Sequence, residues 1–128
     1  MTLVLDAGGV SALAGQRARL VELRRRGAWP AEVPSVVLTE ALTGDHRRDF
    51  YANRLLRACQ IRLVTEPHAR EGARLRTATG RAATISATDA IVAAFASACP
   101  APIVLTSDPR DLTALAEHAA RPVMIACV

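Results

Sequence analysis

The chain has 128 residues, of which 51% are hydrophobic and 22% are charged, and its formal net charge is +4. This length predicts a single domain spanning residues 1–128 and excludes a second hydrophobic core. All 16 basic residues are arginine, and the absence of lysine excludes a Walker-A phosphate loop and a lysine Schiff base. A surplus of arginine is compatible with a nucleic-acid partner, because guanidinium groups grip phosphates through paired hydrogen bonds.

Cysteine usage and hydropathy indicate a cytoplasmic protein. Cys59, Cys99 and Cys127 are odd in number, far apart and outside any Cys-x-x-Cys motif, so we expect reduced thiols and no zinc site. The longest mostly apolar run, Ile91–Cys99, is far shorter than the ~20 residues of a membrane span. The apolar residues before Asp6 follow no basic region, so no secretory signal is expected.

Short apolar runs alternate with longer helical stretches along the chain. In chain order we predict a strand at Thr2–Leu5, a helix at Gly15–Arg26, a strand at Val33–Val37, a short helix at Val37–Leu42, a helix at Arg47–Cys59, a strand at Ile61–Val64, helices at Pro67–Thr79 and Ser86–Ala98, a strand at Pro102–Thr106, a helix at Pro109–Ala119 and a strand at Val123–Val128. A turn at Gly8-Gly9 is a structural alternative to a functional role for Asp6. The first and fourth strands lack polar alternation, which is typical of parallel strands covered on both faces. The pattern therefore predicts an α/β fold, a three-layer α/β/α sandwich around a four- to five-stranded, mostly parallel sheet.

Four acidic residues fall where the carboxyl ends of these strands are expected to meet. Asp6 ends the first strand, and Asp108 lies just beyond the strand at Pro102–Thr106. Glu40 lies in the short helix after the second strand, and Asp89 lies in the first turn of the helix at Ser86. Because ligands of open α/β sheets bind at this edge, the four carboxylates are candidate site residues.

Helix capping is the structural alternative for two of these acids. Ser86-x-x-Asp89 is a capping box, and Asp108-Pro109 is an N-cap followed by proline at the first helical position. Capping does not explain why two apolar strands both lead into an aspartate. The acids as a set therefore favour a functional site over four separate structural roles.

The segments around the four acids resemble the four acidic motifs of the PIN domain, in the order and spacing of that family, and more narrowly those of VapC-type toxins. At Gly8, the second position after the first aspartate, the wider family often has Ser or Thr. The resemblance extends over essentially the whole chain. The matching segments are Val4-Leu5-Asp6-Ala7-Gly8-Gly9, Pro34-Ser35-Val36-Val37-Leu38-Thr39-Glu40, Ser86-Ala87-Thr88-Asp89-Ala90-Ile91-Val92-Ala93-Ala94 and Leu105-Thr106-Ser107-Asp108-Pro109-Arg110-Asp111-Leu112.

The resemblance implies a Mg²⁺- or Mn²⁺-dependent endoribonuclease that hydrolyses RNA by a two-metal mechanism. Asp6, Asp89 and Asp108 would be direct metal ligands, because hard divalent cations prefer carboxylate oxygens. Glu40 would bind through water or orient the attacking water. Asp111, one helical turn beyond Asp108, would support the ligands. The implied partners are an RNA substrate, a VapB-type antitoxin protein and a second copy of the chain in a homodimer.

Substrate contacts are predicted from charge. Arg47 and Arg48 follow the Glu40 helix and are the candidates for contacting RNA phosphates, whereas the cluster Arg24-Arg25-Arg26 is expected to complement a helix C-terminus. With only four aromatic residues, RNA would be recognised through its shape and backbone.

Two alternatives from other classes stay open. One is a catalytically silent PIN-like module that binds RNA or protein. The other is a phosphatase of the haloacid dehalogenase type, which also begins with a strand ending in aspartate. That phosphatase needs a second aspartate where this chain has Gly8, and it needs a lysine that the chain lacks.

Overall fold

The sheet consists of five strands that all run parallel. A computed structural model describes residues 1–128 and orders the strands β3-β2-β1-β4-β5. Strands β1 and β4 lie at the centre in register, with Leu5 opposite Leu105. This sheet confirms the predicted α/β fold class. The strands are β1 (Thr2–Leu5), β2 (Glu32–Pro34), β3 (Gln60–Arg62), β4 (Pro102–Thr106) and β5 (Met124–Cys127).

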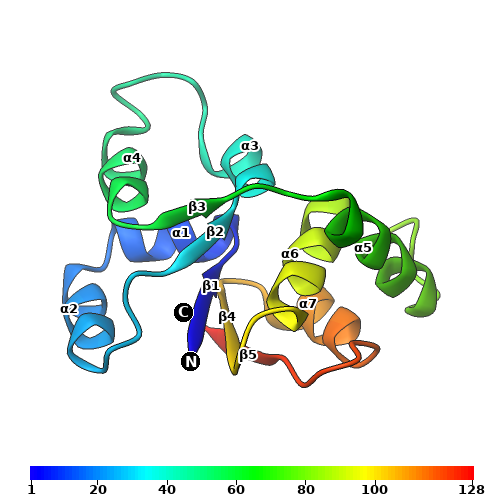
Figure 1. Cartoon of the computed structure of the whole chain (residues 1–128). Coiled ribbons are helices and arrows are strands. Elements are labelled where there is room, and N and C mark those ends of the chain that lie inside the picture. Colours follow the sequence, from blue (N-terminus) through cyan, green and yellow to red (C-terminus); the bar gives the residue numbers. More distant parts are fainter.

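Two groups of helices cover the two faces of the sheet (Figure 1). The first group is α1 (Ala7–Ala14), α2 (Arg17–Arg25), α3 (Leu38–Ala41) and α4 (Phe50–Arg57). The second is α5 (Glu66–Ala78), α6 (Ala87–Ser97) and α7 (Pro109–Ala116). Both faces of the sheet are covered, so the apolar residues of the central strands, such as Leu5 and Val104, are buried in one hydrophobic core. None of the helices is both long and apolar enough to cross a membrane.

Helix α1 was not predicted from the sequence, and it takes the place of the alternative Gly8-Gly9 turn. The Asp6 carboxylate caps this helix by accepting the Gly9 N–H at 2.7 Å, and the Asp6 carbonyl accepts the Val10 N–H at 3.0 Å. Val10 and Leu13 are buried against the sheet. Glycine disfavours a helix by about 1 kcal/mol relative to alanine, so capping and packing here override local propensity.

Three further boundaries differ from the prediction. The second strand stops at Pro34 and continues as a 3₁₀ turn, η1 (Ser35–Val37). The predicted helix at Arg47–Cys59 begins only at Phe50, because the Asp45 side chain accepts the backbone N–H of Arg47 at 2.9 Å and holds a turn. The helix predicted from Gly15 begins at Arg17. The remaining elements agree with the prediction to within three residues at each end.

Gly9 lets α1 lie directly on β4. A Cβ atom at this position would collide with the carbonyl oxygen of Leu105 in β4, which is backbone and cannot rotate away. It would also lie 3.3 Å from the Asp6 carboxylate. Only glycine therefore permits the approach of α1 that places the Asp6 carboxylate over the end of β4.

We expect Gly9→Ala to destabilise the protein by about 1–3 kcal/mol, because the new methyl group forces α1 away from β4. Gly15→Ala is the matched control, since the nearest atom to a Cβ there is the Ala12 carbonyl oxygen at 3.8 Å. Urea unfolding of both variants measures the difference. Equal stabilities for the two variants would contradict the close contact.

Candidate active site

Asp6 lies at the centre of the candidate site. It follows β1, is only 7% exposed, and both of its carboxylate oxygens accept hydrogen bonds. One oxygen accepts the Gly9 N–H at 2.7 Å and the other accepts the Thr106 hydroxyl at 2.5 Å. Burial raises the pKa of Asp6, and these hydrogen bonds oppose the rise because they favour the ionised form. The site is therefore built around an oriented, largely desolvated carboxyl group.

Thr106 links Asp6 to the segment that contains Asp108 through hydrogen bonds. Its side chain is buried at the end of β4, donates to Asp6 and accepts the Asp108 backbone N–H at 3.1 Å. The prediction from the sequence did not include this residue. The available signal was a hydroxyl residue ending an otherwise apolar central strand, one step before the loop that contains Asp108.

Asp89 is the acid most affected by its neighbours. It lies in the first turn of α6, where its backbone N–H donates to the Ser86 hydroxyl at 3.0 Å, as a capping box requires. Burial, followed by the charge of Asp6, raises the pKa of Asp89 to about 6, and Glu40 contributes to the same rise. Like charges raise each other's pKa only at close range. Asp6 and Glu40 therefore belong to the electrostatic surroundings of Asp89.

Asp111 also belongs to this neighbourhood, and Asp108 is placed differently. The charge of Asp111 contributes to the raised pKa of Asp89, while its carboxylate pairs with Arg81 at 2.6 Å. Asp108 is exposed and caps α7, accepting the Arg110 N–H at 3.4 Å. The capping interpretation of Asp108 therefore holds in the structure, and Asp111 is the acid of α7 that acts electrostatically on Asp89.

Gly8 and Ser107 meet at the mouth of this site. A Cβ atom at Gly8 would collide with the Ser107 hydroxyl, so the loop after β4 fills the space that a side chain at position 8 would need. Ser107 is exposed. The Ser107 hydroxyl group therefore lies next to Gly8, which has no side chain of its own.

The donor chemistry of the site fits a hard divalent cation. The candidate ligands are carboxylates, the pKa of Asp6 and of Asp89 is raised by burial and by neighbouring acids, and Mg²⁺ or Mn²⁺ would relieve that repulsion. In the present side-chain arrangement, however, no three acidic, histidine or cysteine side chains are grouped closely enough to hold a metal ion. A cation here would need side-chain rotations that draw the carboxylates together.

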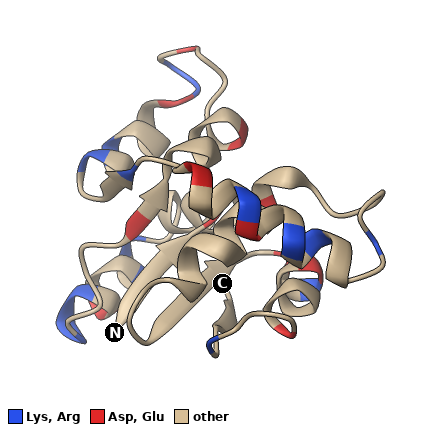
Figure 2. Cartoon of the chain, turned by 45° about the vertical axis from the view of Figure 1, so that its right-hand side comes forward, with Lys and Arg blue, Asp and Glu red and all other residues tan.

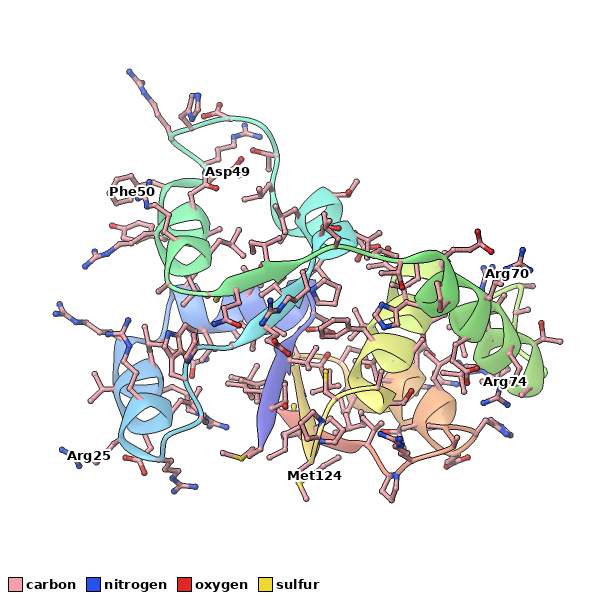
Figure 3. All side chains as sticks on the ribbon, in the orientation of Figure 1. Arg25, Asp49, Phe50, Arg70, Arg74 and Met124 are labelled. Carbon is pink, nitrogen blue, oxygen red and sulfur yellow. The ribbon has the colours of Figure 1, made fainter.

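The predicted RNA-contacting arginines lie in the loop between α3 and α4. Asp49, at the base of this loop beside Phe50 (Figure 3), accepts the Gly44 N–H at 2.8 Å and the Thr43 N–H at 2.9 Å. These hydrogen bonds lower the pKa of Asp49. The loop is therefore an ordered turn, and it leaves Arg47 and Arg48 exposed to solvent.

Charged residues lie mainly on helices and loops, while β1 and β4 contain none (Figure 2). The arginine cluster at the end of α2 behaves as expected for a helix C-terminus. Arg24 and Arg25 lie in the last turn, where they complement the helix dipole, and Arg26 pairs with Glu22 at 2.8 Å.

The raised pKa of Asp89 predicts an unusual dependence of stability on pH. The folded protein binds this proton more tightly than the unfolded chain, in which the pKa is 3.8. The stabilisation is complete below pH 3.8 and is lost as pH rises through about 6. We therefore expect the melting temperature in EDTA to fall between about pH 5 and pH 7.5, with Asp6 adding to the effect in the same direction.

Asp89→Asn should weaken this pH dependence and raise the melting temperature in EDTA near neutral pH. Glu66→Gln is the control, because it removes the same charge from an exposed position on α5. Thermal melts across the pH range make the comparison. If the melting temperature of Asp89→Asn depends on pH in the same way as that of the wild type, Asp89 does not interact with the other acids.

Comparison with known proteins gives matches in structure. No protein-family model matches the chain, and no curated protein matches it in sequence. A DNA-bound VapBC from Salmonella typhimurium aligns with a TM-score of 0.74 at 14% identity, over 99% of this chain and 98% of that one. VapBC2 from Rickettsia felis, bound to a DNA fragment from its promoter, aligns with a TM-score of 0.72 at 14% identity, over 100% and 99% of the two chains.

FitAcB from Neisseria gonorrhoeae aligns with a TM-score of 0.61 at 19% identity, over 96% of each chain. These identities establish similarity of fold, and the alignments span nearly the full length of both partners. They confirm that the chain has the PIN-like fold predicted from its four acidic segments.

Proposed function

We propose that the protein is a Mg²⁺- or Mn²⁺-dependent endoribonuclease and the toxin of a VapBC-type toxin–antitoxin pair. The main support is the raised pKa of Asp89, to which burial and then the charges of Asp6, Glu40 and Asp111, acids from separate segments, contribute. This cluster lies at the carboxyl ends of β1 and β4, where α/β folds bind ligands. The fold shared with VapBC structures supports the toxin assignment.

Each acid has a separate role in this proposal. Asp6 and Asp89 hold the cation, and Thr106 keeps the Asp6 carboxylate in place. Glu40, exposed on α3, orients the attacking water. Asp108 and Asp111 compete for the remaining ligand position on α7. When bound, the cation would neutralise the acids, make water a stronger nucleophile and stabilise the leaving 3′-oxygen.

The antitoxin partner would need an apolar surface on the toxin. A hollow of about 400 Å³ lies between α1, α2 and α4 and has seven hydrophobic residues among the eleven that line it. Three arginines line the same hollow: Arg17, Arg24 and Arg54. Val21 and Tyr51 also line it, and both are largely exposed. Its chemistry fits an antitoxin segment that presents apolar and acidic side chains.

We expect RNA hydrolysis that requires Mg²⁺ or Mn²⁺, stops with EDTA and leaves 5′-phosphate ends, because water and not the 2′-hydroxyl attacks phosphorus. Asp6→Asn and Asp89→Asn should remain folded and lose activity by about two or more orders of magnitude. Gel analysis of a labelled RNA, with chemical identification of its ends, tests this. A 2′,3′-cyclic phosphate product would contradict the two-metal mechanism.

A comparison of Asp108→Asn with Asp111→Asn tests which of these two acids at the start of α7 binds the cation. We infer that Asp111 contributes more, because its charge adds to the raised pKa of Asp89. Capping does not by itself exclude Asp108, since Asp6 also caps a helix. Asn caps helices about as well as Asp, so Asp108→Asn preserves the cap. We expect the larger loss of Mn²⁺-dependent cleavage in Asp111→Asn. A folded wild type that binds RNA and never cleaves it with metal present would favour the silent binding module.

Expression of the chain alone should arrest growth, and co-expression of the antitoxin from the neighbouring gene should relieve the arrest. Val21→Glu, which places a negative charge in the hollow between α1, α2 and α4, should remain toxic but escape the antitoxin. Growth curves and co-purification with that antitoxin measure both effects. Full rescue of Val21→Glu would show that the antitoxin binds elsewhere.

A further inference from the structure

Arg81 lies in a rigid segment between α5 and α6. Its backbone N–H donates to the Thr79 hydroxyl at 3.0 Å, and its carbonyl accepts the N–H groups of Thr84 at 2.9 Å and Ile85 at 3.0 Å. Arg76 holds the other end of the segment by donating to the Ile85 carbonyl at 2.7 Å. The backbone of Arg81 is therefore fixed relative to the start of α6.

The Arg81 side chain reaches from this segment to the acidic site. Its guanidinium pairs with the Asp111 carboxylate at 2.6 Å, 30 positions along the chain. Asp111 is one of the acids whose charge acts on Asp89. The other arginine ion pairs join neighbours within one helix or link adjacent strands, so this is the one ion pair that involves an acid of the site.

Most of the hydrogen-bonding capacity of Arg81 is unused. A guanidinium has five N–H donors, and the protein accepts a hydrogen bond from Nη2 alone. The side chain is 36% exposed, whereas its partner Asp111 is 26% exposed. A fixed, partly exposed guanidinium with free donors thus stands at the rim of a group of carboxylates.

A phosphodiester approaching this site meets several negative charges. A cation at the rim offsets that repulsion, and the planar guanidinium can hold two phosphate oxygens at once. We propose that Arg81, held in place by Asp111, binds a backbone phosphate of the RNA substrate next to the acidic site. The inference rests on the proposed ribonuclease function and assigns a substrate-binding residue that is separate from Arg47 and Arg48.

The test measures RNA binding without cleavage. A fluorescein-labelled single-stranded RNA of mixed sequence is titrated in EDTA at several salt concentrations, and anisotropy gives Kd. Arg81→Ala should weaken binding about tenfold, as expected for a charged hydrogen-bonded contact. It should also reduce the slope of log Kd against log salt by about 0.7, the value for one phosphate contact on a single strand.

Arg70→Ala is the charge-matched control. Arg70 lies on the outer side of α5 (Figure 3), and its side chain is 78% exposed. Its loss should leave the salt slope unchanged. Arg81→Lys should keep the slope and lose part of the affinity, because lysine retains the charge without the paired donors.

Asp111→Asn separates phosphate binding from a purely structural ion pair. Both Asp111→Asn and Arg81→Ala break the same pair, but removing the acid frees the guanidinium and lowers the repulsion of RNA. We expect RNA affinity in EDTA to rise in Asp111→Asn and to fall in Arg81→Ala. Losses of similar size in both variants, or an unchanged slope in Arg81→Ala, would overturn the proposal.

Melting temperatures accompany every titration, and Arg81→Gln replaces Arg81→Ala if the alanine variant does not fold. The results distinguish a failure of the proposed ribonuclease function from a failure of the proposed role of Arg81. If wild type binds RNA with an Arg81-dependent slope but never cleaves it with Mn²⁺, the nuclease assignment fails and the role of Arg81 stands. If wild type binds no RNA in EDTA, the role of Arg81 is overturned whatever its activity.

Discussion

Burial of the Asp6 carboxylate is the constraint on which the rest of the site depends. A carboxylate with little access to water must have both oxygens hydrogen bonded, or folding loses several kcal/mol. Gly9 supplies one donor and must be glycine, because α1 lies against the Leu105 carbonyl. Thr106 supplies the other donor from the end of β4. The positions of β1, α1 and β4 are therefore tied together by one polar group at the edge of the core.

The topology explains why the other acids gather around Asp6. The chain leaves β1 toward β2 on one side and leaves β4 toward β5 on the other, so a crevice opens between the two central strands. Helices α1, α6 and α7 begin at this edge, and each has an aspartate at its N-cap or in its first turn. The partial positive charge of a helix N-terminus stabilises such an acid by about 0.3–1 kcal/mol. Capping and cation binding are therefore compatible roles for the same carboxylates.

The amino-acid sequence predicts the features that depend on local pattern. Strands β1 and β4 have the predicted bounds because their apolar residues are continuous and end at polar ones. Helix α1 was not predicted, because its glycines disfavour a helix locally, whereas in the structure Gly9 is required by the close contact with β4. The roles of Thr106 and Arg81 depend on partners 100 and 30 positions away in the chain, which no spacing rule connects to them. The ion pair of Asp111 with Arg81 likewise becomes visible only in the structure.

Helix capping alone does not explain why this site contains several negatively charged residues. Neutral Asn or Ser caps a helix about as well as Asp, so a fold that needed only caps would avoid placing acids near one another. Burial first, and then the charges of Asp6, Glu40 and Asp111, disfavour the ionised form of Asp89, which lowers the stability of the folded protein near neutral pH. Arg81 offsets only the charge of Asp111. The remaining negative charge favours a cation of higher valence than an arginine, and binding such a cation would recover the stability that the clustered acids cost.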